Sequence, residues 1–545
     1  MLESETCTGT QLMELLRGDA MLALLDVREQ GEFFEAHILR ASNVPAGRME
    51  LLAPVLVPRQ HIPVIVYDDG GNDTRALRAL RSLRQLGYTN VARLAGGLAQ
   101  WQTEGRLVVD GTSCMTKGYA ECLEREAGTP RISPEEILAR VARGEKVVLV
   151  DIRTPEEFKT MSIPGGVLAP GCEAAYRFKD IAPDPDTLVV TNCGARTRGI
   201  LCAQLLRDMG VPNPVAYMSG GTMEWRLSGN ALEYGRETRS AAPSFEAIHY
   251  AHARAGELAR EYGIEFLDED TLARWRGQEE PLYIFDVRQP EEYEAGHLEG
   301  SRSAPGCQLV QLSDDLAAVR QARFVLVDDT EARAVFTAYW LKQLGIANVF
   351  VLKGGLGGAA SAAGKLVRGP EAGVDPDVPQ LPGYSVAALE AAMRGPRAPL
   401  IINVGNSVRH RAGHIPGAVW VPRLRLESVL GRCAVNGVVV LVADTPQHAL
   451  LAANDLKKLL PDVEAGYFTG TADSWRDAGH ALETGMQEDH LPENDSWYLW
   501  YKDPDITREA AKGYLDWEDI LADQLMADKT LAYMTPDKLK ESRNG

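Results

Sequence analysis

One cysteine in this chain is followed by residues that could activate it as a nucleophile. Cys193 comes directly after the apolar run LVVTN and opens the segment Cys-Gly-Ala-Arg-Thr-Arg at 193–198. This pattern predicts a loop between the end of a strand and the start of a helix, where free backbone N–H groups and the helix dipole stabilise an anion. Arg196 and Arg198 would add positive charge, so we expect the Cys193 thiolate to form near neutral pH.

A thiolate at this point could take a sulfane sulfur atom from a donor and hold it as a persulfide, which a second nucleophile then removes. The backbone N–H groups of the loop would bind the persulfide, and two guanidinium groups would orient an anionic donor. The residues expected to bind the persulfide and the donor are Gly194, Ala195, Arg196, Thr197 and Arg198. The alternative is a buried structural thiol, the usual state of a cysteine in an apolar strand. The cationic residues after Cys193 favour the chemical interpretation.

The elements that would position Cys193 occur four times along the chain. Each copy contains an apolar run whose last residue is, in turn, Asp26, Asp151, Asp286 and Asn403. A second apolar run leads 42, 42, 42 and 40 residues later to Asp68, Cys193, Asp328 and Ala443. A glycine-rich turn then follows at Gly96, Gly220, Gly354 and Gly470. Coincident spacings of this kind indicate a duplicated structural unit.

The repeated unit is predicted to be a doubly wound α/β domain with a parallel sheet. Short continuous apolar runs alternate with helical patterns such as 74–86 and 198–209, which is typical of a sheet covered on both faces. A chain of 545 residues is also too long for a single hydrophobic core. The pattern lapses between the copies, which predicts domains at 1–112, 113–243, 244–372 and 373–489 and a tail at 490–545.

The tail is predicted to be helical and to pack across the domains, because it is rich in large aromatic side chains. Its aromatic residues include Trp497, Tyr498, Trp500, Tyr501, Tyr514 and Trp517.

Composition excludes several classes of partner. The formal net charge of −19 and the sequence pI of about 5.1, without any basic run, argue against nucleic acid and anionic membranes. The eight cysteines form no CxxC pair or His-linked metal spacing, so we expect reduced thiols, no metal and no cofactor. No signal-like or membrane-spanning apolar stretch is evident, so we expect a cytoplasmic protein.

Further motifs in the second repeat complete a recognisable order. The segment TPEEF at 154–158 follows Asp151 and Arg153, and GGTMEW at 220–225 follows the Cys193 loop. This order resembles the rhodanese superfamily, in particular its thiosulfate sulfurtransferase-like members, and all four repeats are similar to it. The resemblance implies a sulfurtransferase with Cys193 as its nucleophile. Ser162, where the other copies have His, is expected to affect packing rather than chemistry.

The resemblance also bears on the other repeats and on a rival chemistry. Asp68, Asp328 and Ala443 cannot carry a persulfide, so domains 1, 3 and 4 are expected to be inactive. The acid pairs of domains 1 and 3, Asp68–Asp69 and Asp328–Asp329, suggest either metal binding or a solvated or helix-capping loop, and the second interpretation is favoured. Arg198 lies five residues after Cys193, which resembles the sulfurtransferase loop rather than the longer loop of the related phosphatases.

Three residues are assigned supporting roles. Asp151 and Arg153 are expected to form an ion pair that fixes a loop next to the site. Cys172 lies in an APGC sequence that recurs at Cys307, and it is a candidate resolving or relay thiol, although duplication alone explains the match. Cys202 falls on the apolar face of the following helix and is interpreted as core.

The predicted reaction transfers sulfur from a small anionic donor, such as thiosulfate or a persulfide, to a thiol, a cyanide-like acceptor or a protein. Domain 1 beside domain 2 resembles two-domain rhodaneses, which implies a donor site at the interface between these domains. Two alternatives stay open: a non-catalytic scaffold that carries persulfide on Cys193, and a cysteine-dependent phosphatase or arsenate reductase.

Overall fold

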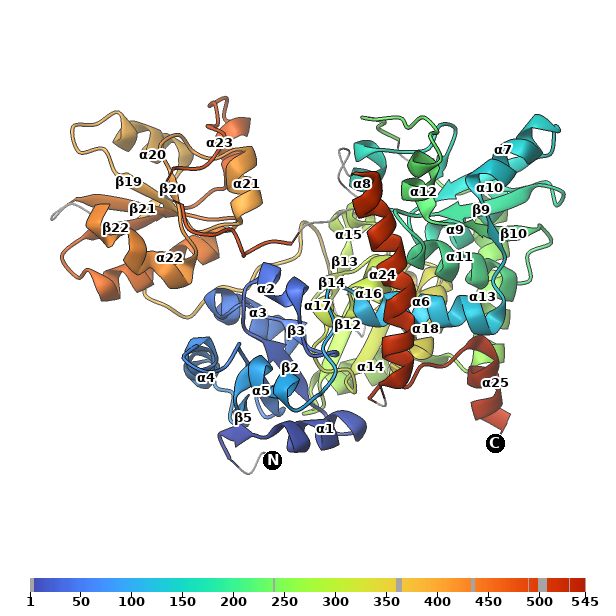
Figure 1. Ribbon diagram of the computed structural model, residues 1–545, viewed down its shortest axis with the longest axis horizontal. Helices are drawn as coiled ribbons and strands as arrows, with labels where there is room; N and C mark the ends of the chain where they lie inside the picture. Colours follow the sequence, from blue (N-terminus) through green and yellow to red (C-terminus); the bar gives the residue numbers. More distant parts are fainter. Residues whose placement is uncertain are drawn as a thin grey trace.

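The computed structural model describes residues 4–238, 241–358, 365–432, 437–488, 490–497, 507–528 and 530–544. Four five-stranded sheets follow one another along the chain, and all strand pairs within them are parallel. The predicted fold class of four doubly wound parallel-sheet domains is confirmed. Figure 1 shows them in the colours of the sequence, with the fourth, orange domain standing beside the other three.

Domain 1 has the strand order β1-β5-β4-β2-β3. Its strands are β1 (Thr6–Cys7), β2 (Ala23–Asp26), β3 (Ser42–Asn43), β4 (Val64–Tyr67) and β5 (Val91–Leu94). Its helices are α1 (Gly9–Arg17), α2 (Gln30–Glu35), η1 (Ala46–Arg48), α3 (Met49–Leu56), α4 (Arg75–Gln85) and α5 (Gly97–Thr103).

Domain 2 repeats this order as β6-β10-β9-β7-β8. Its strands are β6 (Arg131–Ile132), β7 (Val147–Asp151), β8 (Val167–Leu168), β9 (Leu188–Asn192) and β10 (Val215–Met218). Its helices are α6 (Cys114–Ala127), α7 (Pro134–Ala142), α8 (Pro155–Thr160), α9 (Glu173–Tyr176), α10 (Phe178–Ile181), α11 (Thr197–Asp208) and α12 (Gly221–Leu227).

Domain 3 has the order β11-β16-β15-β12-β14 and an added antiparallel pair, β13-β17. Its strands are β11 (Glu265–Leu267), β12 (Leu282–Asp286), β13 (His297–Leu298), β14 (Arg302–Ser303), β15 (Arg323–Val327), β16 (Val349–Leu352) and β17 (Leu366–Val367). Its helices are α13 (Phe245–Tyr262), α14 (Glu269–Arg276), α15 (Pro290–Ala295), α16 (Gly306–Gln311), α17 (Ser313–Leu316), α18 (Ala332–Gln343) and α19 (Gly355–Gly358).

Domain 4 and the tail complete the chain. The sheet has the order β18-β22-β21-β19-β20, with β18 (Gly383–Tyr384), β19 (Leu400–Asn403), β20 (Val419–Trp420), β21 (Val438–Val442) and β22 (Glu464–Phe468). The helices are α20 (Val386–Met393), α21 (Ser407–Ala412), η2 (Arg423–Arg432), α22 (Pro446–Leu459) and α23 (Ala472–Asp477), followed in the tail by α24 (Arg508–Ala527) and α25 (Pro536–Asn544).

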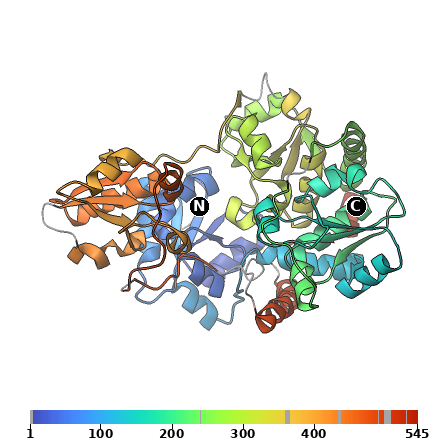
Figure 2. The same cartoon turned by 90° about the horizontal axis from the view of Figure 1, so that it is seen from above.

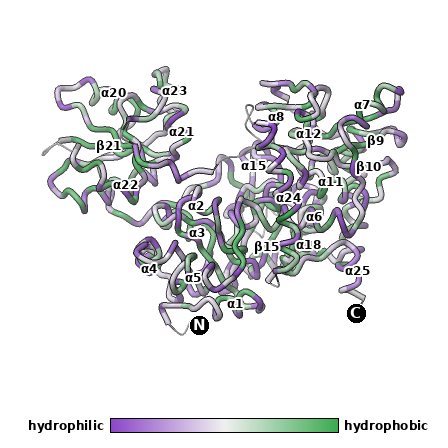
Figure 3. The backbone as a smooth tube through the Cα atoms, in the orientation of Figure 1, coloured by the Kyte–Doolittle hydropathy of each residue, from purple (hydrophilic) through white to green (hydrophobic). Residues whose placement is uncertain are grey.

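Alternate residues of each central strand pack on opposite faces of the sheet. In β4, Val64 and Val66 join one hydrophobic cluster and Ile65 joins another. The same division separates Val439 from Val440 in β21. Both faces of the sheet are therefore buried, as the continuous apolar runs predicted. Figure 3 shows these strands as hydrophobic stretches inside a more polar surface.

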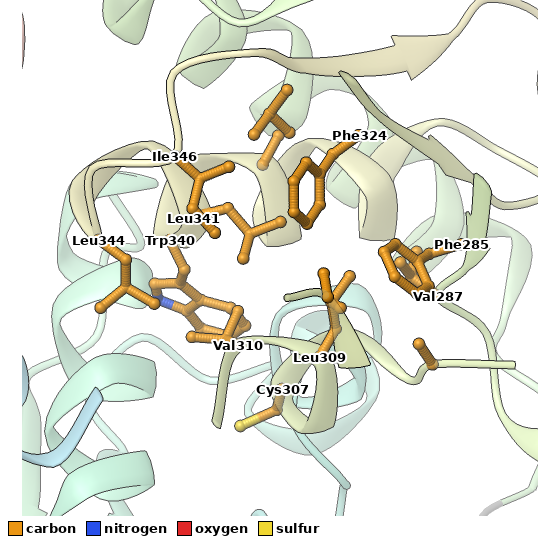
Figure 4. Close-up of a cluster of buried hydrophobic side chains, with 14 of the residues drawn as sticks. Phe285, Val287, Cys307, Leu309, Val310, Phe324, Trp340, Leu341, Leu344 and Ile346 are labelled. Carbon is orange, nitrogen blue, oxygen red and sulfur yellow. The ribbon is translucent and has the colours of Figure 1, made fainter. Parts of the chain in front are cut away.

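Domains 1, 2 and 3 share one continuous core, whereas domain 4 has its own. A single cluster includes Leu25 of domain 1, Val189 of domain 2 and Phe324 of domain 3. Figure 4 shows the part of this cluster around Trp340, whose Nε1 donates to the carbonyl of Leu201 in domain 2 at 3.2 Å. The view from above in Figure 2 shows the orange fourth domain set apart from domains 2 and 3. The first three domains thus form one packed body.

The tail helix α24 lies across α6 of domain 2, and this contact depends on a glycine. A methyl group at Gly118 would lie 1.9 Å from Cδ1 of Leu525, so only glycine permits the two helices to approach so closely. Trp497 stacks on Phe34 of domain 1 at a ring separation of 5.9 Å. Tyr498, Trp500 and Tyr501 lie outside the described residues. Among the described helices, none has the length and apolar character needed to cross a membrane.

Candidate active site around Cys193

Cys193 follows β9 in the middle of the domain 2 sheet, and a glycine turn holds its backbone. The carbonyl oxygen of Cys193 accepts a hydrogen bond from the N–H of Thr222 at 2.8 Å, and that of Gly194 accepts one from Met223 at 3.1 Å. Gly221 has φ of 57°, and a methyl group there would lie 2.4 Å from the Cys193 oxygen. The glycine turn and the cysteine loop are therefore built as one unit.

The thiol of Cys193 is covered, and this changes its acidity. Burial raises the pKa of Cys193, and the residue is only 3% exposed. The charge of Arg198 and the N–H groups of Gly199 and Ala195 act in the opposite direction but do not outweigh burial. The expectation of a thiolate near neutral pH is therefore wrong for the site in this covered arrangement. The predicted backbone N–H groups are present near Cys193, but its sulfur is shielded from water.

Arg198 is engaged by a carboxylate rather than directed at an open site. Its two terminal nitrogens donate to Glu157 at 2.8 and 2.7 Å, and both side chains are 4% exposed. Equivalent pairs join Arg75 to Glu32 in domain 1 and Arg333 to Glu292 in domain 3. Because domains without the cysteine make the same pair, its first role is to hold the loop against the neighbouring helix.

Arg196 links the loop to α6 and to the tail helix α24. Its Nε lies 3.2 Å from Glu121 and 3.4 Å from Glu518, and its Nη1 donates to Asp519 at 2.8 Å. Its Nη2 donates to the carbonyl of Leu515 at 2.9 Å. Burial raises the pKa of Glu121 to about 8, although the positive charge of Arg196 opposes this. The guanidinium that was predicted to orient a donor is held by carboxylates of two helices.

The tail helix brings two further charged residues close to the loop, and the sequence analysis missed both. Glu518 of α24 and Lys117 of α6 are buried, and the Glu518 carboxylate acts electrostatically on Cys193, Arg196 and Lys117. Burial raises the pKa of Glu518. No sequence signal connects positions 117 and 518 to position 193, because the contacts join segments hundreds of residues apart.

Asp151 and Arg153 form the predicted ion pair. Their side chains meet at 2.7 Å in a fully buried setting, and Arg153 also donates to the carbonyl of Met161 at 2.7 Å. Domains 1 and 3 contain the same pair, between Asp26 and Arg28 and between Asp286 and Arg288, each at 2.6 Å. The repetition in domains without the cysteine identifies it as a structural support for the loop.

Cys172 lies at the contact between domains 2 and 3. Its Sγ is 3.4 Å from Oγ1 of Thr337 on α18, and burial raises its pKa well above the ordinary value. The two APGC segments face each other: a methyl group at Gly306 would lie 2.6 Å from Cys172 Sγ. Burial also raises the pKa of Cys307 to about 12. Cys202 is fully buried in the shared core, as predicted.

The acids that stand in place of the cysteine cap helices. Asp68 accepts hydrogen bonds from the N–H groups of Gly70 at 3.0 Å and Ala76 at 2.9 Å. Asp328 accepts from the N–H of Glu331 at 2.5 Å and of Arg333 at 2.8 Å. The capping interpretation of these acids is confirmed. Within the described ranges, no group of three or more His, Cys, Asp or Glu side chains could hold a metal ion.

Ser162 is fully buried, and its hydroxyl has no hydrogen-bond partner among the described residues. At the matching positions, His37, His297 and His414 each direct Nδ1 at a backbone carbonyl four residues earlier. The serine therefore changes local packing, as predicted.

Two cavities flank α24 beside the cysteine loop. The first has a volume of about 380 Å³ and is lined by Arg131, Ser133, Arg196, Ser219, Gly220, Glu224 and Leu515. The second has a volume of about 260 Å³ and is lined by Phe34, Asp110, Gly111, Lys117, Ala510, Gly513, Tyr514 and Trp517. The first cavity touches the cysteine loop at Arg196, and neither cavity is lined by Cys193 itself.

The sheet order, the strand-to-helix loop and the glycine turn define a rhodanese-type domain, and comparison with known families agrees. The rhodanese-like domain family model matches residues 8–104, 133–228 and 268–362, so the chain belongs to this family. Domain 4 lies outside these matches but has the same strand order.

One solved structure resembles the whole chain. A thiosulfate sulfurtransferase from Pseudomonas aeruginosa is 38% identical, with a TM-score of 0.90, over 98% of this chain and 100% of that one. Curated relatives match single domains. The HTH-type transcriptional regulator Rv0324 of Mycobacterium tuberculosis is 34% identical over 116 residues, which is 20% of this chain and 47% of the regulator. A sulfurtransferase of Allochromatium vinosum is 34% identical over 98 residues, which is 18% of this chain and 89% of that protein.

Proposed function

We propose that this protein is a rhodanese-type sulfurtransferase in which Cys193 carries sulfane sulfur from an anionic donor to a thiophilic acceptor. The observation that carries the proposal is the position of Cys193: it lies between the end of β9 and the start of α11, where the backbone N–H groups of Ala195 and Gly199 act to lower the pKa of its thiol. Such a site stabilises a negatively charged sulfur. The likeness to a structure named as a thiosulfate sulfurtransferase supports the same conclusion.

The reaction proceeds in two half-reactions. Once the site opens to the donor and to water, the Cys193 thiol gives its proton to water, and the thiolate attacks the outer sulfur of the donor. The sulfur–sulfur bond of the donor breaks, and the remaining part leaves with the electron pair; thiosulfate would leave as sulfite. The terminal sulfur of the new persulfide bears the negative charge beside the loop N–H groups. An acceptor thiolate or cyanide then removes this sulfur and restores the Cys193 thiolate.

The charge around the loop favours an anionic donor. Arg196 and Arg131 line the larger cavity next to Gly220, which belongs to the turn that clamps Cys193. A donor anion attracted there would compete with the carboxylates of α24 for Arg196. Movement of α24 would then expose the sulfur and weaken the burial that raises its pKa.

A second candidate function is a persulfide carrier that hands sulfur to a protein partner. The burial of Cys193 favours it, because a protein partner that opens the packing around the loop would gain access to the sulfur that small thiols lack. Such a carrier would turn over slowly with small thiols and rapidly with that one protein.

The test compares the wild-type protein with Cys193→Ser, and with Cys7→Ser as a matched control at a buried cysteine of domain 1. Each protein is incubated with thiosulfate, 3-mercaptopyruvate or glutathione persulfide, and thiocyanate formation and intact mass are followed. The wild type and Cys7→Ser should form thiocyanate and gain the mass of one sulfur atom. Cys193→Ser should do neither; retention of activity and of the added sulfur by this variant would refute the assignment.

A further inference from the structure

The smaller cavity beside the site is built from three separate parts of the chain. Phe34 comes from domain 1, Lys117 from α6 of domain 2, and Tyr514 and Trp517 from the tail helix α24. Its volume of about 260 Å³ suits a small organic molecule. Three aromatic rings and one ammonium group dominate its wall, a combination that neither the repeat pattern nor the proposed sulfur chemistry requires.

Lys117 is buried, with 4% of the residue exposed. Among the described residues no carboxylate or carbonyl accepts a hydrogen bond from its Nζ. Its ammonium lies 5.3 Å from the ring centre of Tyr514 and 4.7 Å from that of Trp517. Cation–π contacts of this kind offset only part of the cost of removing an ammonium from water. An anion placed against Nζ would offset much of the rest.

The aromatic wall is fixed by contacts of its own. Trp517 donates from Nε1 to Oδ1 of Asp110 at 2.9 Å, so this carboxylate of the cavity is occupied. A methyl group at Gly111, which has φ of 88°, would lie 2.6 Å from Cζ2 of Trp517. The indole is therefore seated directly on the chain that links domains 1 and 2. A wall held in this way is organised before any ligand arrives.

The cavity adjoins the Cys193 site through shared charges. Glu518 acts electrostatically on both Cys193 and Lys117, and Arg198 acts on the same two residues. Glu518 lies on α24 one residue after Trp517, between the cavity and the cysteine loop. A molecule anchored at Lys117 would thus be held beside the helix that covers the sulfur.

We infer that this cavity binds a small organic anion, with its acidic group on Lys117 Nζ and its apolar part against Phe34, Tyr514 and Trp517. Neither Cys193 nor any other residue of its loop lines this cavity, so the anion held there is a separate ligand and not the sulfur donor of the proposed reaction.

Binding is tested without chemistry, in the Cys193→Ser background. Benzenesulfinate, a small aromatic anion, is titrated by calorimetry and by the change in tryptophan fluorescence. Sulfate serves as the inorganic probe. Benzenesulfinate should bind about tenfold more tightly than sulfate because only it can occupy the aromatic wall. Added Lys117→Met should weaken its binding about tenfold or more, while Lys117→Arg should retain most of it.

Lys179→Met is the matched control, since Lys179 also lies over an aromatic ring, that of Tyr250, at 4.9 Å but lines neither cavity. It should leave binding unchanged. Trp517→Phe should abolish the fluorescence change even if Lys117→Met fails to fold. Equal affinity for sulfate and benzenesulfinate, or unaltered binding in Lys117→Met, would overturn the inference. Because these measurements involve no sulfur transfer, their failure is distinct from a failure of the Cys193 assignment.

Discussion

The cysteine loop of domain 2 and the corresponding loop of domain 3 have the same structural surroundings, but one begins with a thiol and the other with a carboxylate. Each follows a central strand, leads into a helix and is held by an Arg–Glu pair, Arg198 with Glu157 and Arg333 with Glu292. In domain 3 the carboxylate of Asp328 accepts the N–H groups at the helix start. In domain 2 the N–H groups of Ala195 and Gly199 meet a sulfur atom. The site at the start of the helix is thus a property of the fold, and the side chain that occupies it differs between the two domains.

The residue three positions further along is positively charged in domain 2 and negatively charged in domain 3. Arg196 in domain 2 reaches out to α6 and α24, whereas Glu331 in domain 3 accepts the N–H of Gly354 in its own glycine turn at 2.6 Å. Domain 3 therefore closes its loop with internal bonds. In domain 2 the corresponding residue, Arg196, is held by α6 and by the tail helix α24 instead.

Among the substitutions that test the comparison of domains 2 and 3, Cys193→Asp should have the largest effect on activity. The carboxylate should accept the same N–H groups as Asp328 does, so the domain should fold, with its melting temperature within a few degrees of the wild type. Thiocyanate formation should fall by at least about a thousandfold, because a carboxylate forms no persulfide. Activity assays and calorimetry on the same preparation check both parts.

The reverse exchange is the control for this prediction. Asp328→Cys in the Cys193→Ser background places a thiol in the domain 3 frame, where Asp329 and Glu331 replace the positive charge supplied in domain 2. It should not restore turnover. Restored activity would show that the frame alone suffices and that the surroundings of Cys193 add nothing.

Glu157→Gln and Glu292→Gln should separate the structural from the chemical role of the Arg–Glu pair. Removal of one partner from a buried pair costs about 3 kcal/mol or more, and the Glu157 side chain is 4% exposed. Glu292 is 35% exposed, so its replacement should cost less. Both variants should melt earlier, but only Glu157→Gln should lower kcat/KM. Equal losses of activity in the two variants would contradict this division.

The sequence was sufficient to predict the repeats, the sheets and the strand-to-helix loop that contains Cys193. Spacing of Asp151, Cys193 and Gly220 depends on local geometry within one domain, and local patterns carry that information. The cover over Cys193 could not be predicted in this way. Its partners Glu518 and Asp519 lie in a segment with ordinary amphipathic spacing, and nothing in that spacing indicates which surface the helix packs against. The wrong expectation about the Cys193 pKa has a similar origin, because burial in the core shared by the first three domains outweighs the effect of the loop.

Asp328→Asn should change how stability depends on pH. Burial raises the pKa of Asp328 to about 7, although Arg333 opposes this, so the folded state binds the proton more tightly than the unfolded chain does. The stability gained from the neutral carboxyl is therefore present below about pH 4 and is lost as pH rises towards 7. Asn removes this dependence. Melting temperatures of the variant and wild type should converge at low pH and diverge at pH 7; parallel curves would contradict the prediction.

Asp519→Asn should loosen the contact of α24 with the Cys193 loop of domain 2. It tests whether this loop depends on the tail helix, unlike the Asp328 loop of domain 3, which is closed by bonds within its own domain. The Arg196–Asp519 bond is 2.8 Å long but Asp519 is 55% exposed, so its loss should cost no more than about 1 kcal/mol. Transient opening of the helix, and with it alkylation of Cys193 by iodoacetamide, should increase up to about fivefold. Lys538→Met, which removes a bond between α25 and Glu126 of α6, is the control and should leave the rate unchanged. If Asp519→Asn also left the rate unchanged, α24 would have to be a fixed part of domain 2, and the donor would have to enter through a cavity beside it without any movement of the helix.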